Sequence, residues 1–283
     1  MADTAFQVQY RQEFIATFEQ HQSLLRDVVT TEAVIKGNQA TFLVAGSGGA
    51  TAQTRGVNGL IAARGDDLTQ TTATLVEWHD LVRKTNFNIF ASQGNQRQIM
   101  QSTTMGVVNR VVDDQIIDQL ATGTIVLNTT PVTASVELVL RARAVLTAAK
   151  VPWDGNITLL ASAGMMTYLQ QAPEFSKGEY VSLRPFETGG TAWRDVPMGY
   201  RWNNILIIEH PMLSLNTSAE KCYMFHKSAI GHAVDTAGIQ SPVGYNEEQD
   251  YSWARCSVNA GAKLLQNSGV VVINHDSSAI APA

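Results

Sequence analysis

The residues best suited to acid–base or metal chemistry are the histidines, and their spacing matches no catalytic or metal-binding motif. None belongs to a His-Glu-x-x-His sequence, and no two are four residues apart, the spacing that places two ligands on one helix face. His226 and His232 lie close in sequence, with Asp235 as the nearby carboxylate, and we interpret both as packed or surface residues. The six histidines are His21, His79, His210, His226, His232 and His275.

The glycine-rich tract Gly46-Ser47-Gly48-Gly49 is the part of the chain nearest in composition to a phosphate-binding loop. It lacks the Gly-Lys-Ser/Thr that reaches phosphates and Mg²⁺, and it precedes a polar segment where a dinucleotide-binding loop would precede a helix. No Gly-x-Ser-x-Gly nucleophile elbow occurs in the sequence. A catalytic group assembled from distant residues stays open, because triad members need not be close in sequence.

Two groups of carboxylates have the composition of a possible cation site. Glu247-Glu248-Gln249-Asp250 is predicted to be a solvated loop, with a cation or an arginine-bearing neighbour as the alternative. Asp113, Asp114 and Asp118 are predicted to lie on the solvated face of a long helix. We therefore predict no catalytic, cofactor-binding or metal-binding residue, and we name Glu247 and Glu248 as candidates for contact with another subunit.

Composition is typical of a globular protein that is made in a cytoplasm and stays soluble there. The chain has 283 residues, of which 45% are hydrophobic and 16% charged, and its net charge of −5 demands no nucleic-acid or lipid partner. Cys222 and Cys256 show no metal spacing and suit a reducing compartment, where we expect both to be buried. The first residues lack signal-peptide features, and no apolar run approaches the roughly 18 residues of a membrane span.

The most unusual stretch runs from Phe42 to Trp78. An apolar run, Phe42 to Ala45, and a β-favouring run, Thr69 to Trp78, flank a long glycine-rich polar tip, which predicts an extended hairpin. The tip has too few apolar residues to pack a core, and connections this long are usually functional or disordered. We therefore expect a neighbouring subunit to stabilise it, and its contact candidates are Arg55, Arg64, Asp66 and Asp67.

The elements around this hairpin predict an α+β fold. Phe14 and Phe18 belong to an amphipathic helix from Tyr10 to Leu25, which covers either its own core or an adjacent subunit, so both are contact candidates. A helix of about 40 Å should run from Ser92 to Gly123. The second half predicts helices from Pro131 to Ala149 and from Ala163 to Gln171 and a loop from Glu174 to Tyr200. It also predicts strands at 156–161, at 205–208 within 201–210, and at 221–226, 251–258 and 270–273.

This order of elements resembles the major capsid proteins of tailed bacteriophages, which have the Hong Kong 97-type fold. The resemblance covers nearly the whole chain and rests on order and texture more than on a diagnostic motif. Its better local matches are Asn156 to Ser162 followed by a short helix, the small-residue turn Ser228 to Ala233, and Gly261 to Leu265 followed by Gly269 to Ile273.

The resemblance implies an N-terminal arm over residues 1–36 and an E-loop hairpin over 37–85. It further implies a P-domain with a spine helix over 86–130, an A-domain over 131–240, and a return through the P-domain over 241–283. The implied function is self-assembly into hexamers and pentamers of an icosahedral shell in the virion, assembled in the bacterial host cytoplasm around double-stranded DNA. Implied partners are further copies of the chain, a separate scaffolding protein and a portal, with no sequence-specific DNA binding, no membrane and no cofactor.

One departure from the family changes the expected mode of interlocking. Some members cross-link an E-loop lysine to a neighbour, but no lysine lies between Lys36 and Lys84, so we predict non-covalent contact. Two alternatives stay open: an encapsulin-type compartment that holds cargo enzyme, and an α+β enzyme with a scattered site. Neighbouring genes would separate the first from a capsid, and particle size would separate the second.

Overall fold

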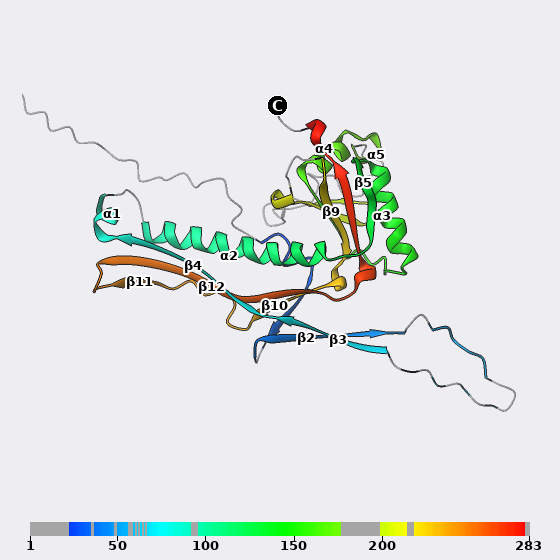
Figure 1. The fold of residues 1–283 in the computed structure, drawn as a ribbon, viewed down its shortest axis with the longest axis horizontal. Coiled ribbons are helices and arrows are strands. Elements are labelled where there is room, and N and C mark those ends of the chain that lie inside the picture. The colour runs from blue at the N-terminus through cyan, green and yellow to red at the C-terminus, as the bar shows by residue number, and fades with distance from the viewer. Residues whose placement is uncertain are drawn as a thin grey trace, which may run out of the picture.

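The computed structural model describes residues 23–34, 37–47, 50–55, 59, 61, 63, 65, 67–91, 96–176, 199–213 and 218–280. The molecule is elongated, with a lobe of helices and strands at one end of a long helix-covered sheet, and a hairpin that projects away from both (Figure 1). The predictions for the helix carrying Phe14 and Phe18, for Arg64 and Asp66, and for most of the loop after Glu174 lie outside the described residues.

The lobe is built on a six-stranded sheet in the order β5-β13-β9-β6-β8-β7. Two of its inner strands, β6 and β8, are nearly continuous apolar runs, as expected for strands buried on both faces. The bounds of the strands are β5 Val126–Thr133, β6 Ile157–Ala161, β7 Gly199–Trp202, β8 Ile205–Glu209, β9 Glu220–His226 and β13 Val270–Asp276.

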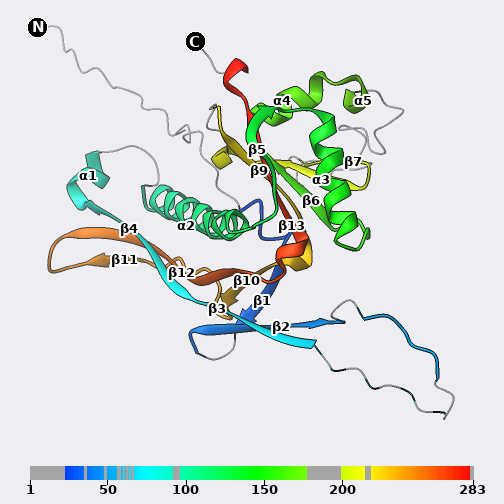
Figure 2. The same ribbon diagram turned by 45° about the vertical axis from the view of Figure 1, so that its right-hand side comes forward.

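Alternate residues of these strands enter two different cores, because successive side chains point to opposite faces of a sheet. Leu159 and Met224 pack with residues of α3 (Val136–Ala148) and α4 (Ala163–Gln171). The adjacent residues Leu160 and Phe225 pack instead with α2 (Gln96–Ala121). The lobe sheet therefore lies between α3 and α4 on one face and the end of α2 on the other (Figure 2).

The prediction that a helix begins at Pro131 is wrong. Pro131 lies within β5, and α3 begins only after Ser135. A proline fits there because β5 is the edge strand of its sheet, and the pairing of β5 with β13 shifts register between Leu127 and Val132. The predicted strand at 156–161 and the helix from Ala163 to Gln171 are confirmed.

The second, long sheet contains five strands and extends from the lobe under α2. Its central strand, β12, pairs with β4 along one edge and with β10 and β11 along the other, and β10 also pairs with β1 in parallel. The bounds are β1 Thr30–Val34, β4 Val76–Thr85, β10 Ile230–Asp235, β11 Val243–Asn246 and β12 Tyr251–Leu264, and α1 (Asn86–Ala91) follows β4.

Helix α2 runs along one face of the long sheet. Its 26 residues span about 40 Å, as predicted, and Gly106 does not interrupt it. Val108 packs on Cys256 and Val258 of β12, whose period-2 alternation places these residues under the helix. The prediction that all three aspartates face solvent is wrong for Asp113, which is buried because the lobe and the segment before β1 cover that side of the helix.

The projecting hairpin consists of β2 (Gln39–Gly46) and β3 (Asp67–Thr74), paired antiparallel from Gln39 with Thr74 to Gly46 with Asp67. The hairpin is confirmed, but its predicted end at Trp78 is wrong. Trp78 belongs to β4 and pairs with Val258 of β12, because the chain changes partner at Leu75. Short remaining elements are α5 Pro173–Ser176 and 3₁₀ turns at Pro211–Leu213, Lys227–Ala229, Asn267–Gly269 and Ser278–Ile280.

Candidate subunit interface

The root of the hairpin is anchored on the long sheet by one aromatic ring. Phe42 is 4% exposed and packs with Ala40, Ala73 and Ala233 in a small separate core. A Cβ atom on Gly231 of β10 would lie 2.8 Å from the Cζ atom of Phe42, so the ring occupies the space that the missing side chain leaves. Gly231 and Ala233 point away from α2, and the hairpin therefore leaves the body on the face of the sheet opposite the helix.

Beyond this anchor the hairpin exposes apolar side chains. Leu43 is 73% exposed and Leu68 is 60% exposed. The register pairs Leu43 with Gln70 and Ala45 with Leu68, which places the two leucines diagonally on one face. Arg55 is exposed in the segment beyond β2, and Asp67 is the first residue of β3. The described part of the hairpin thus buries its root and leaves an apolar face uncovered.

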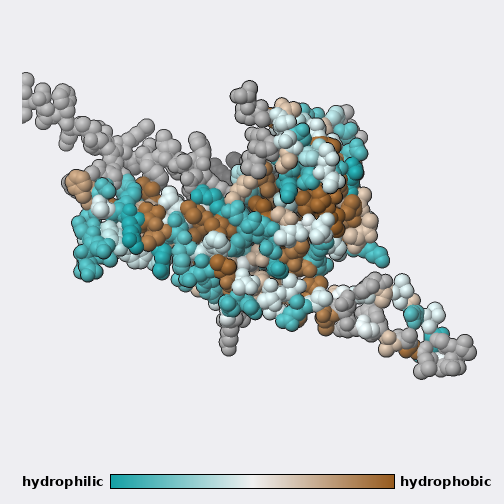
Figure 3. All heavy atoms as spheres, viewed as in Figure 1, coloured by the Kyte–Doolittle hydropathy of each residue, from teal (hydrophilic) through white to brown (hydrophobic). Residues whose placement is uncertain are grey.

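The predicted contact residues Glu247 and Glu248 lie at the opposite end of the molecule, in the turn that joins β11 to β12 (Figure 1). Both are exposed, and hydrophilic residues dominate this end on the face drawn in Figure 3. The Asn246 side chain accepts hydrogen bonds from the backbone N–H groups of Glu248 and Gln249, at 3.0 and 3.1 Å. This Asx-type turn holds the carboxylates in place before any partner arrives.

A second network ties the acidic turn to the neighbouring strand. Tyr245 donates to the Asp250 carboxylate, and the side-chain amide of Asn86 donates to the same oxygen at 2.6 Å. The hydrogen bond to Asp250 raises the pKa of Tyr245 above its ordinary value. Asn86 is the first residue of α1 and directly follows β4, so the turn is fixed to the end of the long sheet.

No described helix or strand covers the face of the long sheet opposite α2 beyond the hairpin root. Register places Leu81, Arg83, Tyr251, Trp253 and Arg255 on this face, whereas the alternate residues of β12 are buried under the helix. Arg83 lies over the Tyr251 ring at 5.1 Å, and Trp253 covers Gly244 of β11. Leu81 is 43% exposed and both arginines are exposed. The face combines partly covered aromatic rings with exposed cationic groups, a composition common at protein interfaces.

Comparison with known proteins decides what such a molecule is. A sequence profile described as phage capsid protein matches residues 2–277, which is nearly the whole chain. The chain belongs to the phage capsid protein family. This membership assigns it a structural role in a capsid shell. No curated protein matches the chain.

Solved structures similar to this capsid protein share its fold at low sequence identity. The capsid of Ralstonia phage GP4 has a TM-score of 0.73 at 11% identity, covering 99% of this chain and 98% of that one. A chain from the head of Helicobacter pylori bacteriophage KHP40 has 0.70 at 11% identity, with 97% and 96% covered. A chain of Mycobacterium phage Che8 has 0.68 at 16% identity, with 96% and 98% covered. The capsid protein therefore has the Hong Kong 97-type α+β fold.

One cluster in the lobe of the capsid protein has the composition of a hydrolase site but not its geometry. Ser162 Oγ, Cys222 Sγ and a Glu220 oxygen lie 3.0, 3.3 and 3.4 Å from the same atom, Nε2 of His275. A catalytic triad instead uses both ring nitrogens, one toward the nucleophile and one toward the acid. All four side chains are buried, and burial lowers the pKa of His275 and raises that of Cys222 to about 12. We interpret the cluster as a structural polar core.

Sequence reasoning missed this cluster, because the other members lie 53 to 113 residues from His275 along the chain. Both cysteines are buried and unpaired with each other, as predicted. Over the described ranges, no three His, Cys, Asp or Glu side chains gather where they could hold a metal ion. Within the same ranges, no helix is both long enough and apolar enough to cross a membrane.

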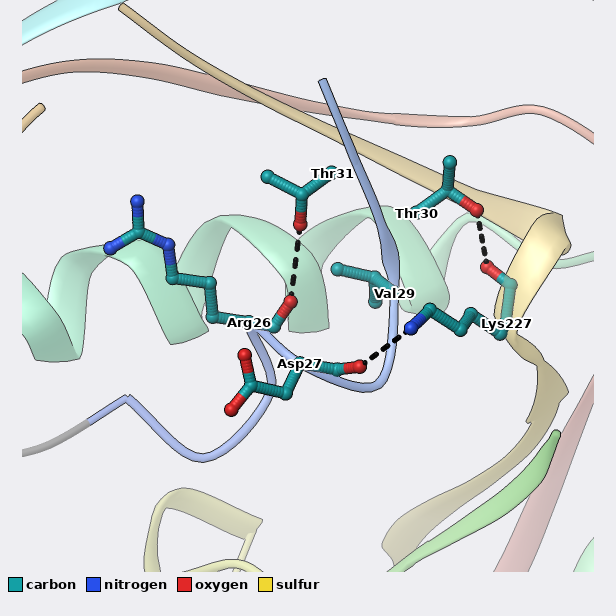
Figure 4. Close-up of a pocket in the computed structure, with 6 residues that line it drawn as sticks. All are labelled: Arg26, Asp27, Val29, Thr30, Thr31 and Lys227. Atoms are coloured by element: carbon teal, nitrogen blue, oxygen red, sulfur yellow. Dashed lines mark hydrogen bonds between the residues drawn. The ribbon is translucent and has the colours of Figure 1, made fainter. Parts of the chain in front are cut away.

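Figure 4 shows a shallow pocket of about 390 Å³ between the segment before β1 and the connection from β9 to β10. The Lys227 amine donates to the Asp27 carbonyl at 3.0 Å, and the Thr30 hydroxyl donates to the Lys227 carbonyl at 3.1 Å. The Thr31 hydroxyl donates to the Arg26 carbonyl at 3.2 Å. Because these polar groups bind one another, we interpret the pocket as a seam between packed segments, not as a ligand site.

Proposed function

We propose that copies of this chain assemble into hexamers and pentamers of an icosahedral shell that encloses the double-stranded DNA genome of a tailed phage. The observation that carries the proposal is a hairpin whose described part buries its root and exposes Leu43 and Leu68 beyond it. Exposed apolar faces on an extended hairpin are costly in an isolated subunit, and contact with a second copy removes them from water. Family membership supports the same proposal.

The partner surface is the open face of the long sheet on an adjacent copy. The hairpin leaves the body on the face opposite α2. If a second copy lies beside the first in the same orientation, the hairpin of the first can therefore lie against the open sheet face of the second. That face offers Leu81 and Trp253 for apolar contact and Arg83 and Arg255 for charge pairing. The contact joins two different surfaces, and such a contact closes into a ring when the rotation between neighbouring copies divides a full turn evenly.

Opposite charges at the two ends of the molecule set the register of this contact. Arg55 lies on the hairpin, and the preorganised turn carries Glu247 and Glu248. We assign Arg55 of one copy to the acidic turn of another, with Arg64, Asp66 and Asp67 as further contact candidates of the hairpin. Such exposed pairs contribute about 0.2–1 kcal/mol each, so they select orientation more than they add affinity.

In this proposal each part of the chain corresponds to one of the domains that the family resemblance implies. Residues 37–85 are the E-loop, residues 86–130 are the P-domain with α2 as its spine helix, residues 131–240 are the A-domain, and residues 241–283 return through the P-domain. Residues 1–36, including Phe14 and Phe18, form an arm that contacts an adjacent copy. Interlocking is non-covalent. A scaffolding protein and a portal are the further partners, assembly takes place in the host cytoplasm, and the DNA is contained without sequence-specific binding.

Electron microscopy of charge-swapped variants tests the proposal. Arg55→Glu alone and Glu247→Lys with Glu248→Lys should each reduce the yield of closed particles, and their combination should restore it, because the attraction is rebuilt with reversed signs. Glu137→Lys on α3, an exposed carboxylate outside the proposed contact, is the matched control and should assemble normally.

Three outcomes would count against specific parts of the proposal. Small oligomers without particles from the unmodified chain would contradict the shell. Particles that carry cargo enzyme in place of DNA would favour a compartment over a virion. Normal yield from both single-sided variants would remove the charge pairing and leave the apolar hairpin contact as the interlock.

A further inference from the structure

A buried carboxylate in the middle of α2 joins three separate parts of the chain. The side chain of Asp113 is fully buried. One of its oxygens accepts hydrogen bonds from the Ser23 hydroxyl and from the backbone N–H of Leu25 at 3.3 Å. The other accepts from the backbone N–H of Leu24 at 3.0 Å and lies 3.2 Å from Nε2 of His210. An ionised carboxylate only accepts, so the proton of this last bond belongs to the imidazole.

The three parts that meet at this carboxylate are far apart along the chain. Ser23 to Leu25 open the described chain and lead into β1, Asp113 belongs to the P-domain helix, and His210 follows β8 in the lobe. Two further hydrogen bonds fix His210. Its ring atom Nδ1 accepts from the backbone N–H of Met212, and its backbone N–H donates to the backbone carbonyl of Ala161.

The electrostatic balance at Asp113 depends on all of these donors together. Burial opposes ionisation, but hydrogen bonds from His210, Ser23 and Leu24 outweigh it and hold the pKa of Asp113 below its ordinary value. A buried charge that loses a partner becomes strongly unfavourable, whereas a complete set of partners is stable. Leu25, Val112 and Leu213 pack in the same core, which keeps water from substituting for a lost donor.

We propose that Asp113 is a latch that fixes the position and direction of Ser23 to Leu25 relative to both the spine helix and the lobe. Loss of the charge releases Ser23 to Arg26 locally, while the two sheets stay folded. The idea that this direction matters for an arm reaching another copy rests on the proposed function, but the latch itself is a property of the single chain. Asp113 is a positioning residue in this proposal.

Hydrogen exchange on the purified full chain tests the latch. Asp113→Asn keeps the shape of the side chain but removes its charge, and it should speed exchange at the amides of Leu24 and Leu25 by about tenfold to a hundredfold, as expected when charge-assisted hydrogen bonds weaken. Amides within α3, such as those of Val139 and Leu146, should keep their protection. The matched control is Asp114→Asn, which changes the adjacent, exposed carboxylate and should leave all of these amides unchanged.

Three results would overturn the latch: unchanged exchange at Leu24 and Leu25 in Asp113→Asn, an equal increase in Asp114→Asn, or a uniform loss of protection that includes α3. If Asp113→Asn does not fold, Ser23→Ala removes one donor only and should give a smaller increase at the same two amides; no increase there would also overturn the latch. Particle formation is scored separately by microscopy, so failure of the shell and failure of the latch are distinguishable.

Discussion

Adding a single methyl group at Gly231 should undock the hairpin without unfolding the body. The Cβ atom of Gly231→Ala would lie 2.8 Å from Cζ of Phe42 and 3.0 Å from both Cε atoms, closer than side chains tolerate. The ring has little room to retreat, because Ala40, Ala73 and Ala233 enclose it. Overpacking of this kind costs about 1–3 kcal/mol, which is about fivefold to a hundredfold in the equilibrium between docked and undocked hairpin.

Hydrogen exchange at the amides of β2 and β3, together with particle counts by electron microscopy, measures this effect. Gly231→Ala should lose protection in the hairpin and lower particle yield, while the unfolding midpoint of the lobe stays unchanged, since the lobe core does not include Phe42. Gly65→Ala is the matched control, because its Cβ would meet nothing within 4 Å.

A double-mutant cycle separates the clash from other effects. Phe42→Leu lacks the ring atoms that Gly231→Ala would strike, so the combined variant should cost less than the sum of the two single ones, by at least about 0.5 kcal/mol. Additive costs, or normal hairpin protection in Gly231→Ala, would refute the idea that the ring seated on Gly231 is the anchor.

Two further predictions concern buried titratable groups. Burial, and secondarily the charge of Arg26, lower the pKa of His232 from 6.5 to about 4. Between pH 6.5 and pH 4, His232 is therefore protonated in the unfolded chain but stays neutral in the folded protein. The free energy of unfolding should fall by about 3 kcal/mol as pH falls from 6.5 to 4. Urea unfolding at pH 7 and pH 4.5 should show a smaller acid loss for His232→Leu, and an equal loss would contradict this assignment. Burial raises the pKa of Cys222 to about 12, so a thiol reagent at pH 8 should label it only after denaturation; rapid labelling of the native protein would argue against its burial.

Several elements were predictable from the sequence because their signals are local. The alternation from Tyr251 to Val258 matches the burial pattern of β12, and the helix from Ala163 to Gln171 starts at a capping serine and stops before Pro173. The long helix and the hairpin likewise follow from side-chain spacing and from the glycine-rich tip. Spacing along one segment depends only on the period of that segment, so no partner needs to be known.

Where segments meet was not predictable from those patterns. The run from Thr69 to Trp78 favours strand throughout, but only the tertiary structure decided that the chain leaves β2 at Leu75 and joins β12. Proline is common at the first position of a helix, so the sequence around Pro131 favours a helix start there. Pro131 can instead lie within β5 because that strand is at the edge of its sheet. Both corrections concern pairing, which is a property of two segments at once.

The candidate interface was likewise predictable from the sequence in part only. Composition and spacing alone picked out a hairpin without a core of its own and an acidic run, and so identified the surfaces proposed here to join copies of the chain. The tertiary structure decided that Phe42 sits on Gly231, that the acidic turn lies at the far end of the molecule, and that Asp113 is buried among donors from Ser23, Leu24 and His210. The periodicity of a segment predicts which face of its helix or strand each side chain is on. The burial and ionisation of that side chain depend on which residues from distant parts of the chain pack against it.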